Sequence, residues 1–417
     1  MTNDAGTALY NEKQKRIEDS IALRRPDRIP SAFMATFWMA KYAGINHRTL
    51  MYDIDQGEDI LRRVLEDLDP DMFMLPHLNT YLGPSMDKLG FKQLQWPGHG
   101  VGDDQPYQYL DREYMKAEEF DEFIADPTGF YLHTYLPRIG SAFEGFENLP
   151  LFPGLHYTRI VTGMRGFAQP ATRKALQAVI EAGEENQKLF DHMVAFIAER
   201  QAKGFPIGSS HTSIAPYDFF ADYFRGAKGM MMDLYRRRDK LMEAMDKIVP
   251  FLLRHALMAT GPMPCKIVFI PIHWAPDKFM SPQQFKDVYW PSFKKLLLAM
   301  IEAGLIPMPL WEAECDKRME IIGDGMPRGK MIYWFERSDI RRAKEILGDV
   351  VCLRGNISPS ILNLGTPEQV DAACRETIEV AGKDGGLILD CAFGVPDEAP
   401  VENIRALYRS VKKYLPG

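Results

Sequence analysis

The sequence lacks the features that mark several large classes of protein. Its five cysteines include no CxxC pair, and their odd number argues against a framework of disulfides. No run approaches the roughly 18 apolar residues that a membrane helix needs. The chain has no long stretch rich in Lys and Arg, and its 50 basic and 57 acidic residues give a net charge of −7. We therefore do not expect a nucleic acid or a membrane as a partner. We therefore expect a cytoplasmic protein that binds small molecules or other proteins.

Nucleotide-binding loops are absent as well. No GxGxxG motif follows an apolar run, and the chain contains no Gly-Lys-Ser/Thr motif of the phosphate-binding kind. Such motifs mark the ligand sites of open, doubly wound sheets. Their absence favours a different arrangement for any parallel sheet in this chain.

Short apolar runs alternate with amphipathic stretches from about residue 203 onward, and this pattern predicts strands separated by helices. Several helices begin with capping residues, such as Ser281, Asp339 and Thr366. Strands connected in this way form a parallel sheet, and without nucleotide motifs we predict a (β/α)8 TIM barrel. The predicted strands are 205–209, 266–272, 306–312, 330–335, 351–355 and 386–390, and the predicted helices are 283–303, 340–347 and 367–381.

The first 150 or so residues are less regular and include Gly/Pro-rich pieces such as LQWPGHGVGDD at 94–104. No low-complexity linker and no internal repeat separates them from the rest. We predict one domain over residues 1–417, in which residues 1–150 contain N-terminal helical additions, early barrel elements and insertions.

Polar residues that end the apolar runs are the candidates for chemistry, because the catalytic groups of a barrel lie at the carboxyl ends of its strands. His77, His211 and His273 each follow such a run. His273 is followed by Trp274 and is a candidate acid, ligand or substrate contact, although a histidine in this position also serves simply as a hydrogen-bonded structural residue.

A second strand end combines carboxylates with a thiol. Glu312, Glu314 and Cys315 follow the run 306–311, and carboxylates are costly to bury without a partner or a metal. Zinc accepts both ligand types, and Cys391 ends a later strand. We predict zinc ligands at Glu312, Cys315 and Cys391, with Glu314 as an alternative. The same pattern fits a metal-free chain in which the cysteines are small buried apolar residues.

Several segments together resemble the uroporphyrinogen decarboxylase superfamily, particularly its corrinoid-dependent methyltransferase branch. Each segment is short, but their order along the chain matches and covers most of its length. They are residues 24–30 (RRPDRIP), 215–220 (APYDFF), 223–226 (YFRG), 279–285 (FMSPQQF), 289–291 (YWP), 303–307 (AGLIP), 311–312 (WE), 339–344 (DIRRAK), 353–359 (LRGNISP), 364–370 (LGTPEQV) and 391–403 (CAFGVPDEAPVEN).

The resemblance implies a barrel with a funnel at its C-terminal face, and two segments indicate the branch. True decarboxylases carry an Arg-rich stretch after the first strand, which holds substrate carboxylates, whereas residues 31–40 read SAFMATFWMA. The methyltransferase branch has a His-x-Cys pair and a later Cys that bind zinc. This chain keeps the later Cys391 but has Glu312-Ala313-Glu314-Cys315 in place of the pair.

The resemblance implies the methyltransferase component of an O-demethylase. Such an enzyme takes the methyl group of an aromatic methyl ether and gives it to the cobalt of a separate corrinoid protein. The chain has no DxHxxG motif, so cobalamin is expected on a partner that docks at the barrel mouth, and the resemblance also implies a homodimer.

A departing phenolate needs a Lewis acid or a proton donor. Zinc on the predicted ligands would serve, and without a metal His273 or a protonated Glu314 would donate the proton. The residues expected to contact the substrate are Phe37, Trp38, His211, Tyr217 and Trp311, with Phe33 and Phe219 as further candidates for the pocket wall.

Three alternatives remain open from the sequence. The chain could transfer a methyl group to or from a thiol or amine carrier, and it could be a decarboxylase, which the missing Arg-rich stretch disfavours. It could also be a barrel that binds a ligand or partner without catalysis, with Glu312 and the cysteines as structural residues.

Overall fold

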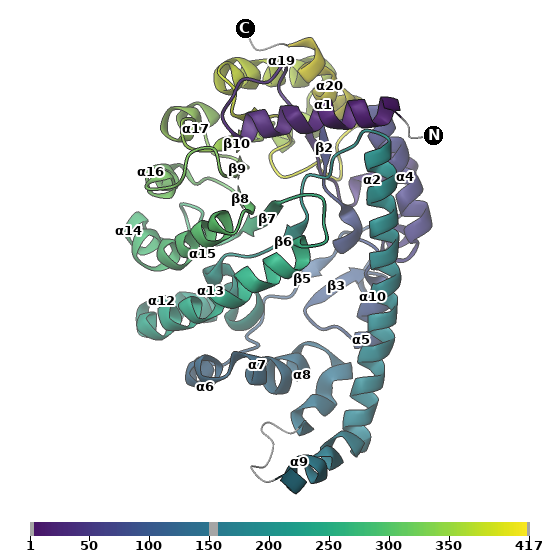
Figure 1. Cartoon of the computed structure of the whole chain (residues 1–417), viewed down its shortest axis with the longest axis vertical. Helices are drawn as coiled ribbons and strands as arrows, with labels where there is room; N and C mark the ends of the chain where they lie inside the picture. Colours follow the sequence, from purple (N-terminus) through teal and green to yellow (C-terminus); the bar gives the residue numbers. More distant parts are fainter. Residues whose placement is uncertain (1–3, 150–156, 415–417) are drawn as a thin grey trace.

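Eight short parallel strands close into a barrel in the computed structural model, which describes residues 4–149 and 157–414 (Figure 1). Six of the strands form one sheet in the order β11-β10-β9-β8-β7-β6, and β1 pairs with β2. Two bridges complete the ring, Ser31 with Leu389 and Phe73 with Ile207. The strands are β1 (Ala32–Phe33), β2 (Met72–Phe73), β6 (His211–Thr212), β7 (Ile267–Ile272), β8 (Ile306–Trp311), β9 (Ile332–Phe335), β10 (Cys352–Arg354) and β11 (Leu387–Ile388).

The predicted (β/α)8 fold is confirmed, and most predicted strands lie within two residues of the observed ones. The exception is the predicted strand 205–209, where only Ile207 pairs with a neighbour and β6 begins at His211. The predicted caps are present, because Ser281, Asp339 and Thr366 each accept a backbone N–H of the helix that follows.

Helices surround the strands and follow them in the chain (Figure 1). On the left of that view they cover β7, β8 and β9. The helices around the barrel are α2 (Trp38–Ala43), α3 (His47–Tyr52), α4 (Ile54–Leu68), α11 (Pro216–Asp218), α12 (Gly226–Arg236), α13 (Arg238–Thr260), α14 (Pro282–Gln284), α15 (Trp290–Glu302), α16 (Met319–Gly323), α17 (Ile340–Leu347), α18 (Pro359–Leu364), α19 (Pro367–Thr377) and α20 (Val401–Lys413).

The core has an inner and an outer layer, because successive strand residues face opposite sides. In β9, Ile332 and Trp334 belong to the cluster inside the barrel, whereas Tyr333 and Phe335 pack in the outer layer beneath the helices. Helix α1 (Asp4–Ile21) contributes Ile21 to the inner cluster, and Ile21 shares a cavity wall with the first residue of β8. Helix α1 therefore covers the amino-terminal end of the barrel and leaves the carboxyl end open.

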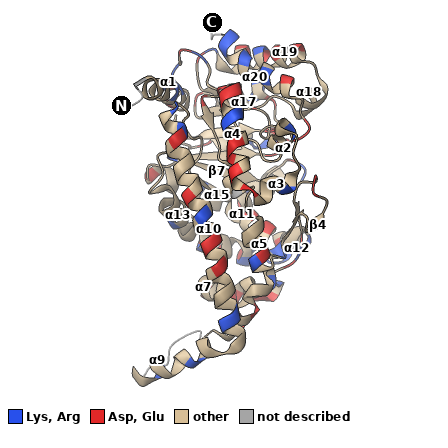
Figure 2. Ribbon diagram, turned by 90° about the vertical axis from the view of Figure 1, so that its right-hand side faces the viewer, with Lys and Arg blue, Asp and Glu red and all other residues tan. Residues whose placement is uncertain are grey.

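A long insertion separates β2 from β6. It contains the small sheet of β3 (Leu94–Pro97), β4 (Gly100–Val101) and β5 (Gln108–Tyr109). The long α10 (Pro170–Ala202) returns to the barrel (Figure 1), and α9 (Tyr157–Gly163) projects from the body at its far end (Figure 2). The insertion runs beyond the predicted limit at residue 150. Its other helices are α5 (Gly83–Leu89), α6 (Phe120–Ala125), α7 (Pro127–Phe130) and α8 (Leu136–Ile139).

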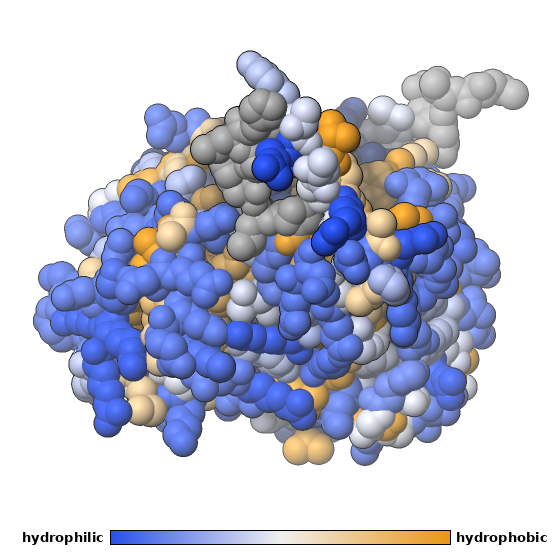
Figure 3. Space-filling view, turned by 90° about the horizontal axis from the view of Figure 1, so that it is seen from below, coloured by the Kyte–Doolittle hydropathy of each residue, from blue (hydrophilic) through white to orange (hydrophobic). Residues whose placement is uncertain are grey.

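The end of the molecule that carries α9 is mainly hydrophilic, with scattered apolar residues (Figure 3). Val161 and Met164 are among the exposed apolar side chains at this end of the molecule. No helix in residues 4–149 or 157–414 has both the length and the apolar character that crossing a membrane requires.

Candidate functional site

His273 and Glu312 lie side by side at the open end of the barrel. Strands β7 and β8 pair with Ile272 opposite Trp311, so the residues that follow the two strands are neighbours. Nε2 of His273 lies 3.4 Å from Oε1 of Glu312. The His273 side chain is 38% exposed and the Glu312 side chain 23%, so both reach the solvent at the barrel mouth.

Two aspartates on the segment after β6 fix the position of His273. Asp222 lies on a π-helix (Phe219–Arg225), and its Oδ2 accepts a hydrogen bond from Nδ1 of His273 at 2.5 Å. Its Oδ1 accepts Nε1–H of Trp274 at 2.7 Å. Asp218, at the end of α11, accepts the backbone N–H of His273 at 2.9 Å. With Nδ1 engaged by Asp222, Nε2 is the nitrogen that remains for a ligand.

Asp218 is buried more deeply than the other carboxylates. Its Oδ2 also accepts the hydroxyl of Tyr289 at 3.1 Å, whereas Oδ1 has no hydrogen-bond partner within the described part of the chain. Burial, followed by the charge of Asp222, raises the pKa of Asp218. Asp218 thus holds the backbone of His273 and the hydroxyl of Tyr289 in place.

The charges around His273 favour its protonated form. Burial lowers the pKa of His273, but the hydrogen bond that its Nδ1 donates to Asp222 and the charges of Glu312, Asp222 and Asp218 outweigh burial and raise it to about 9. Burial and the charges of Glu336 and Asp222 raise the pKa of Glu312 to about 7, against the opposing charge of His273. At neutral pH the imidazole is therefore charged, and Glu312 exchanges a proton readily.

A cavity of about 320 Å³ opens at the same end of the barrel. Glu336, directly after β9, lines it and accepts the backbone N–H of Ala313 at 2.6 Å, which connects the cavity wall to the Glu312 loop. From the insertion, Tyr107 lines the cavity and packs edge to face with Tyr109 at 5.6 Å. The full lining is Met34, Ala35, Thr36, Phe37, Pro106, Tyr107, Glu336, Pro359, Phe393, Gly394, Val395, Pro396 and Asp397.

The insertion also borders the mouth. Tyr109 of β5 is 74% exposed, and its ring packs against Tyr107, which lines the cavity. The mouth is bounded by strand ends on one side and by the β5 segment on the other.

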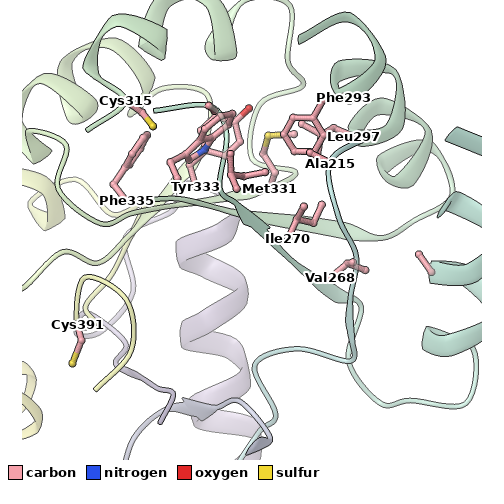
Figure 4. Packing of buried hydrophobic residues seen from close by; sticks show 14 of the residues in the cluster. Ala215, Val268, Ile270, Phe293, Leu297, Cys315, Met331, Tyr333, Phe335 and Cys391 are labelled. Carbon is pink, nitrogen blue, oxygen red and sulfur yellow. The ribbon is translucent and has the colours of Figure 1, made fainter. Parts of the chain in front are cut away.

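The predicted zinc ligands do not come together. The Cys315 thiol is fully buried and donates to the backbone carbonyl of Glu312 at 3.4 Å, after a left-handed turn at Ala313 (φ 51°). Cys391 is also fully buried, in a separate part of the core (Figure 4), where Asp390 and Cys374 influence its pKa.

Burial raises the pKa of both thiols well above its ordinary value. Among residues 4–149 and 157–414, no group of three or more His, Cys, Asp or Glu side chains is arranged to hold a metal ion. The residues present do not fit zinc, and the prediction of Glu312, Cys315 and Cys391 as a ligand set is corrected on this point.

Three of the predicted substrate contacts face the protein core instead. Trp311 is the last residue of β8 and points outward, into the layer of Phe293 and Tyr333. Trp38 donates its Nε1–H to the carbonyl of Ala399 at 2.8 Å. Tyr217 is almost fully buried beside Tyr289, and Phe33 is buried as well. These rings are buried in the core and are not among the residues that line the mouth cavity.

The remaining predictions lie at or near the mouth. Phe37 lines the cavity, where its ring stacks on His47 at 4.6 Å. His211 lines a smaller cavity of about 40 Å³, and burial, together with the charge of His255, lowers its pKa to about 4, so it is neutral at physiological pH. Glu314 is exposed beside the cluster, and its backbone carbonyl accepts the N–H of Asp277 at 2.8 Å.

The other histidine at a strand end is structural. His77 is fully buried, and its Nε2 lies 3.1 Å from Glu58. Four important carboxylates were not predicted from the sequence. Glu336 directly follows a strand and obeys the rule that selected His273, whereas Asp218 and Asp222 are four residues apart on one helical face, a spacing that could have indicated a pair. Asp397 lies in a loop, and no pattern in the sequence marks it.

A family profile described as Uroporphyrinogen decarboxylase (URO-D) matches residues 193–414, more than half of the chain. Among similar curated proteins are uroporphyrinogen decarboxylases of three bacteria. The Coxiella burnetii (strain Dugway 5J108-111) protein is 32% identical over 77 residues, which are 18% of this chain and 21% of the relative. The Trichodesmium erythraeum (strain IMS101) protein is 37% identical over 75 residues, again 18% and 21%.

The third relative, from Chlorobium phaeovibrioides (strain DSM 265 / 1930), is 29% identical over 138 residues, 32% of this chain and 38% of the relative. The chain thus spans between about a fifth and two fifths of these relatives' lengths. Among solved structures, a methyltransferase from Methanosarcina mazei shares the fold with a TM-score of 0.63 and 16% identity, over 96% of this chain and 98% of that chain.

Proposed function

The chain belongs to the uroporphyrinogen decarboxylase family, and we propose that within this family it is a methyltransferase. It moves the methyl group of an aromatic methyl ether to the cobalt of a separate corrinoid protein. The observation that carries the proposal is the charged imidazole of His273 at the barrel mouth, with Nδ1 held by Asp222 and Nε2 directed toward Glu312. The fold shared with the Methanosarcina mazei methyltransferase is compatible with this function.

The chemistry needs a proton donor because the leaving group is a phenolate. As the bond between the methyl carbon and the ether oxygen breaks, its electron pair stays on the oxygen and the methyl carbon passes to the acceptor. His273 donates its Nε2 proton to that oxygen, and the product leaves as a neutral phenol. A donor whose pKa is about 9 suits this task, because it is close to the phenol value of roughly 10.

Glu312 and Asp222 have different roles in this reaction. Asp222 orients the ring and stabilises the imidazolium before the proton leaves. Glu312, with a pKa of about 7, lies next to Nε2 and returns a proton to the ring after turnover. The acceptor is the corrinoid of a partner protein, which supplies a nucleophilic cobalt and docks at the open end of the barrel.

A decarboxylase acting on a tetrapyrrole with many carboxylates fits this mouth less well. Such a substrate would meet Asp222, Glu312 and Glu336 at the strand ends, and like charges at short range repel. The segment that follows β1 adds no Arg to offset them. The proposal therefore places the chain apart from the decarboxylases whose family it shares.

The test is an anaerobic assay with reduced cob(I)alamin and a set of methoxyphenols, in which methylcobalamin is followed by its absorption spectrum. We expect methylcobalamin with the wild type and a rate at least about 100-fold lower with His273→Gln, because the proton donor is lost. His192→Gln is the matched control, since His192 is also partly exposed and lies near carboxylates, but on α10. Failure to methylate cob(I)alamin from any methoxyphenol would overturn the proposal.

A further inference from the structure

The mouth cavity has a wall of aromatic rings and carboxylates. Phe37, Tyr107 and Phe393 contribute rings, and Glu336 and Asp397 contribute carboxylates. The lining contains no Lys or Arg, within the part of the chain that the structure describes. The volume of about 320 Å³ lies within the range of small-molecule sites.

The two wall carboxylates have different surroundings. Glu336 accepts the N–H of Ala313, whereas burial raises the pKa of Asp397 against the opposing effects of His47 and of the backbone of Phe37 and Trp38. Glu336 is also paired with the exposed Arg337, at 3.1 Å from Nε. Arg337 offsets part of the charge of Glu336, whereas Asp397 forms no ion pair within the described part of the chain, so Asp397 contributes most of the negative potential in the cavity.

The neighbouring cluster adds to this potential. One imidazole, His273, faces Asp222 and Glu312 and receives support from Asp218. A second imidazole, His47, stacks on Phe37 of the wall, so four carboxylates face two imidazoles around the mouth, namely those of Asp222, Glu312, Glu336 and Asp397. Aromatic faces carry negative charge density as well and attract cations within about 6 Å of the ring centre.

We propose that the aromatic methyl ether carries a positively charged group, such as an alkylammonium, which the cavity binds between the rings of Phe37, Tyr107 and Phe393 and the carboxylates of Glu336 and Asp397. This inference rests on the proposed function, because it names the substrate class of the same site. The ring of such a substrate reaches toward His273, and its cationic tail occupies the cavity. A substrate with a carboxylate tail is repelled from the same place.

The test compares three ligands with the same methoxyphenol ring and tails of different charge. They are 4-hydroxy-3-methoxyphenethylamine, 4-ethyl-2-methoxyphenol and 3-(4-hydroxy-3-methoxyphenyl)propanoate. Affinity is measured by titration calorimetry on the full chain without an acceptor. We expect the amine to bind at least about tenfold more tightly than the neutral ligand, and the propanoate to bind most weakly.

Three variants assign the effect to the cavity. Asp397→Asn and Glu336→Gln remove the charge and keep a carbonyl oxygen, and each should reduce the preference for the amine several-fold. Glu398→Gln removes the same charge from the residue next to Asp397, but this side chain is 84% exposed and lies outside the lining, so the preference should not change. Circular dichroism of each variant reports whether it folds.

The outcomes separate this inference from the proposed function. Equal affinity for the three ligands, a preference for the propanoate, or an amine preference that persists in both Asp397→Asn and Glu336→Gln would overturn the inference, even if methyl transfer occurs. Tight, charge-dependent binding of the amine without methyl transfer to cob(I)alamin from any methoxyphenol would overturn the proposed function and leave the charge selectivity of the cavity standing.

Discussion

Two groups of charged side chains lie at different depths of the same barrel, and they differ in how their charges are matched. In the interior, Arg354 donates from Nε and Nη2 to Asp390 at 2.9 and 2.7 Å, and both side chains are fully buried. The guanidinium also lies 3.7 Å from the ring centre of Trp334. At the mouth, the imidazole of His273 faces several carboxylates and remains partly exposed.

The difference separates a structural charge pair from a reactive one. Burial raises the pKa of Asp390 to about 6 although Arg354 opposes the shift, so each partner is needed to keep the other charged in the core. At the mouth, the hydrogen bond to Asp222 and the nearby carboxylates raise the pKa of His273, and burial together with the charges of Glu336 and Asp222 raises that of Glu312, which allows protons to move near neutral pH. Matched charges stabilise the fold, whereas unmatched charges are available for a ligand.

The largest effect is expected from breaking the matched pair. Arg354→Met leaves Asp390 without its partner in the barrel interior, and the free energy of unfolding should fall by about 3–5 kcal/mol. Denaturant unfolding measures this loss. The double variant Arg354→Met/Asp390→Leu removes both charges and should lose much less than the sum of the two single variants. A loss below about 1 kcal/mol in Arg354→Met would show that the pair does not stabilise the barrel.

A smaller effect is expected from removing one of the negative charges around His273 at the barrel mouth. Asp222→Asn removes the hydrogen-bonded carboxylate that does most to raise the pKa of His273, so this pKa should fall from about 9 toward the ordinary value near 6.5. NMR titration of the imidazole measures the change. Asp55→Asn is the control, because Asp55 lies 4.0 Å from His192 on the outer surface. An unchanged His273 titration would contradict the role given to Asp222.

The same shift predicts how stability depends on pH. His273 has a raised pKa in the folded state, so its contribution to stability is fully present below about pH 6.5 and is lost as the pH rises through about 9. In Asp222→Asn this loss should occur at lower pH. Thermal unfolding of the wild type and the variant across this pH interval checks the sign.

The smallest effect is expected at the thiols. Cys391→Ala removes one buried sulfur atom, so the free energy of unfolding should fall by about 1 kcal/mol and methyl transfer should change less than about twofold. Metal analysis of the purified protein accompanies these measurements. If the wild type contained one zinc ion per chain and Cys391→Ala contained none, the placement of the two thiols in separate parts of the core would be contradicted.

The sequence was informative where residues follow strands in a regular barrel. His273 and Glu312 were predicted because an apolar run that ends in a polar residue marks the mouth, and the parallel register then makes the two neighbours. Trp311 was assigned to the wrong face. The strands of a parallel barrel are buried on both sides, so an unbroken apolar run does not show which residues point outward.

The parts that escaped prediction depend on tertiary structure. Asp222 lies on a π-helix, which the apolar pattern of the sequence does not predict. Asp222 contacts His273 only because this helix packs against the end of β7. Cys315 and Cys391 both follow strands, but spacing along the chain does not reveal whether their side chains converge on a metal. The insertion lacks the regular alternation of strands and helices that marks the barrel. Its first and last residues can therefore be assigned only from its contacts with the barrel.

The most direct measurement of the central claim is the pH dependence of methyl transfer to cob(I)alamin from a dimethoxybenzene, a substrate without a titrating group. If protonated His273 donates to the leaving oxygen, the rate is constant near neutral pH and falls as the pH rises through about 9. In Asp222→Asn the fall moves to lower pH. A transfer rate that is unchanged or that rises between about pH 8 and about pH 10 would contradict the claim.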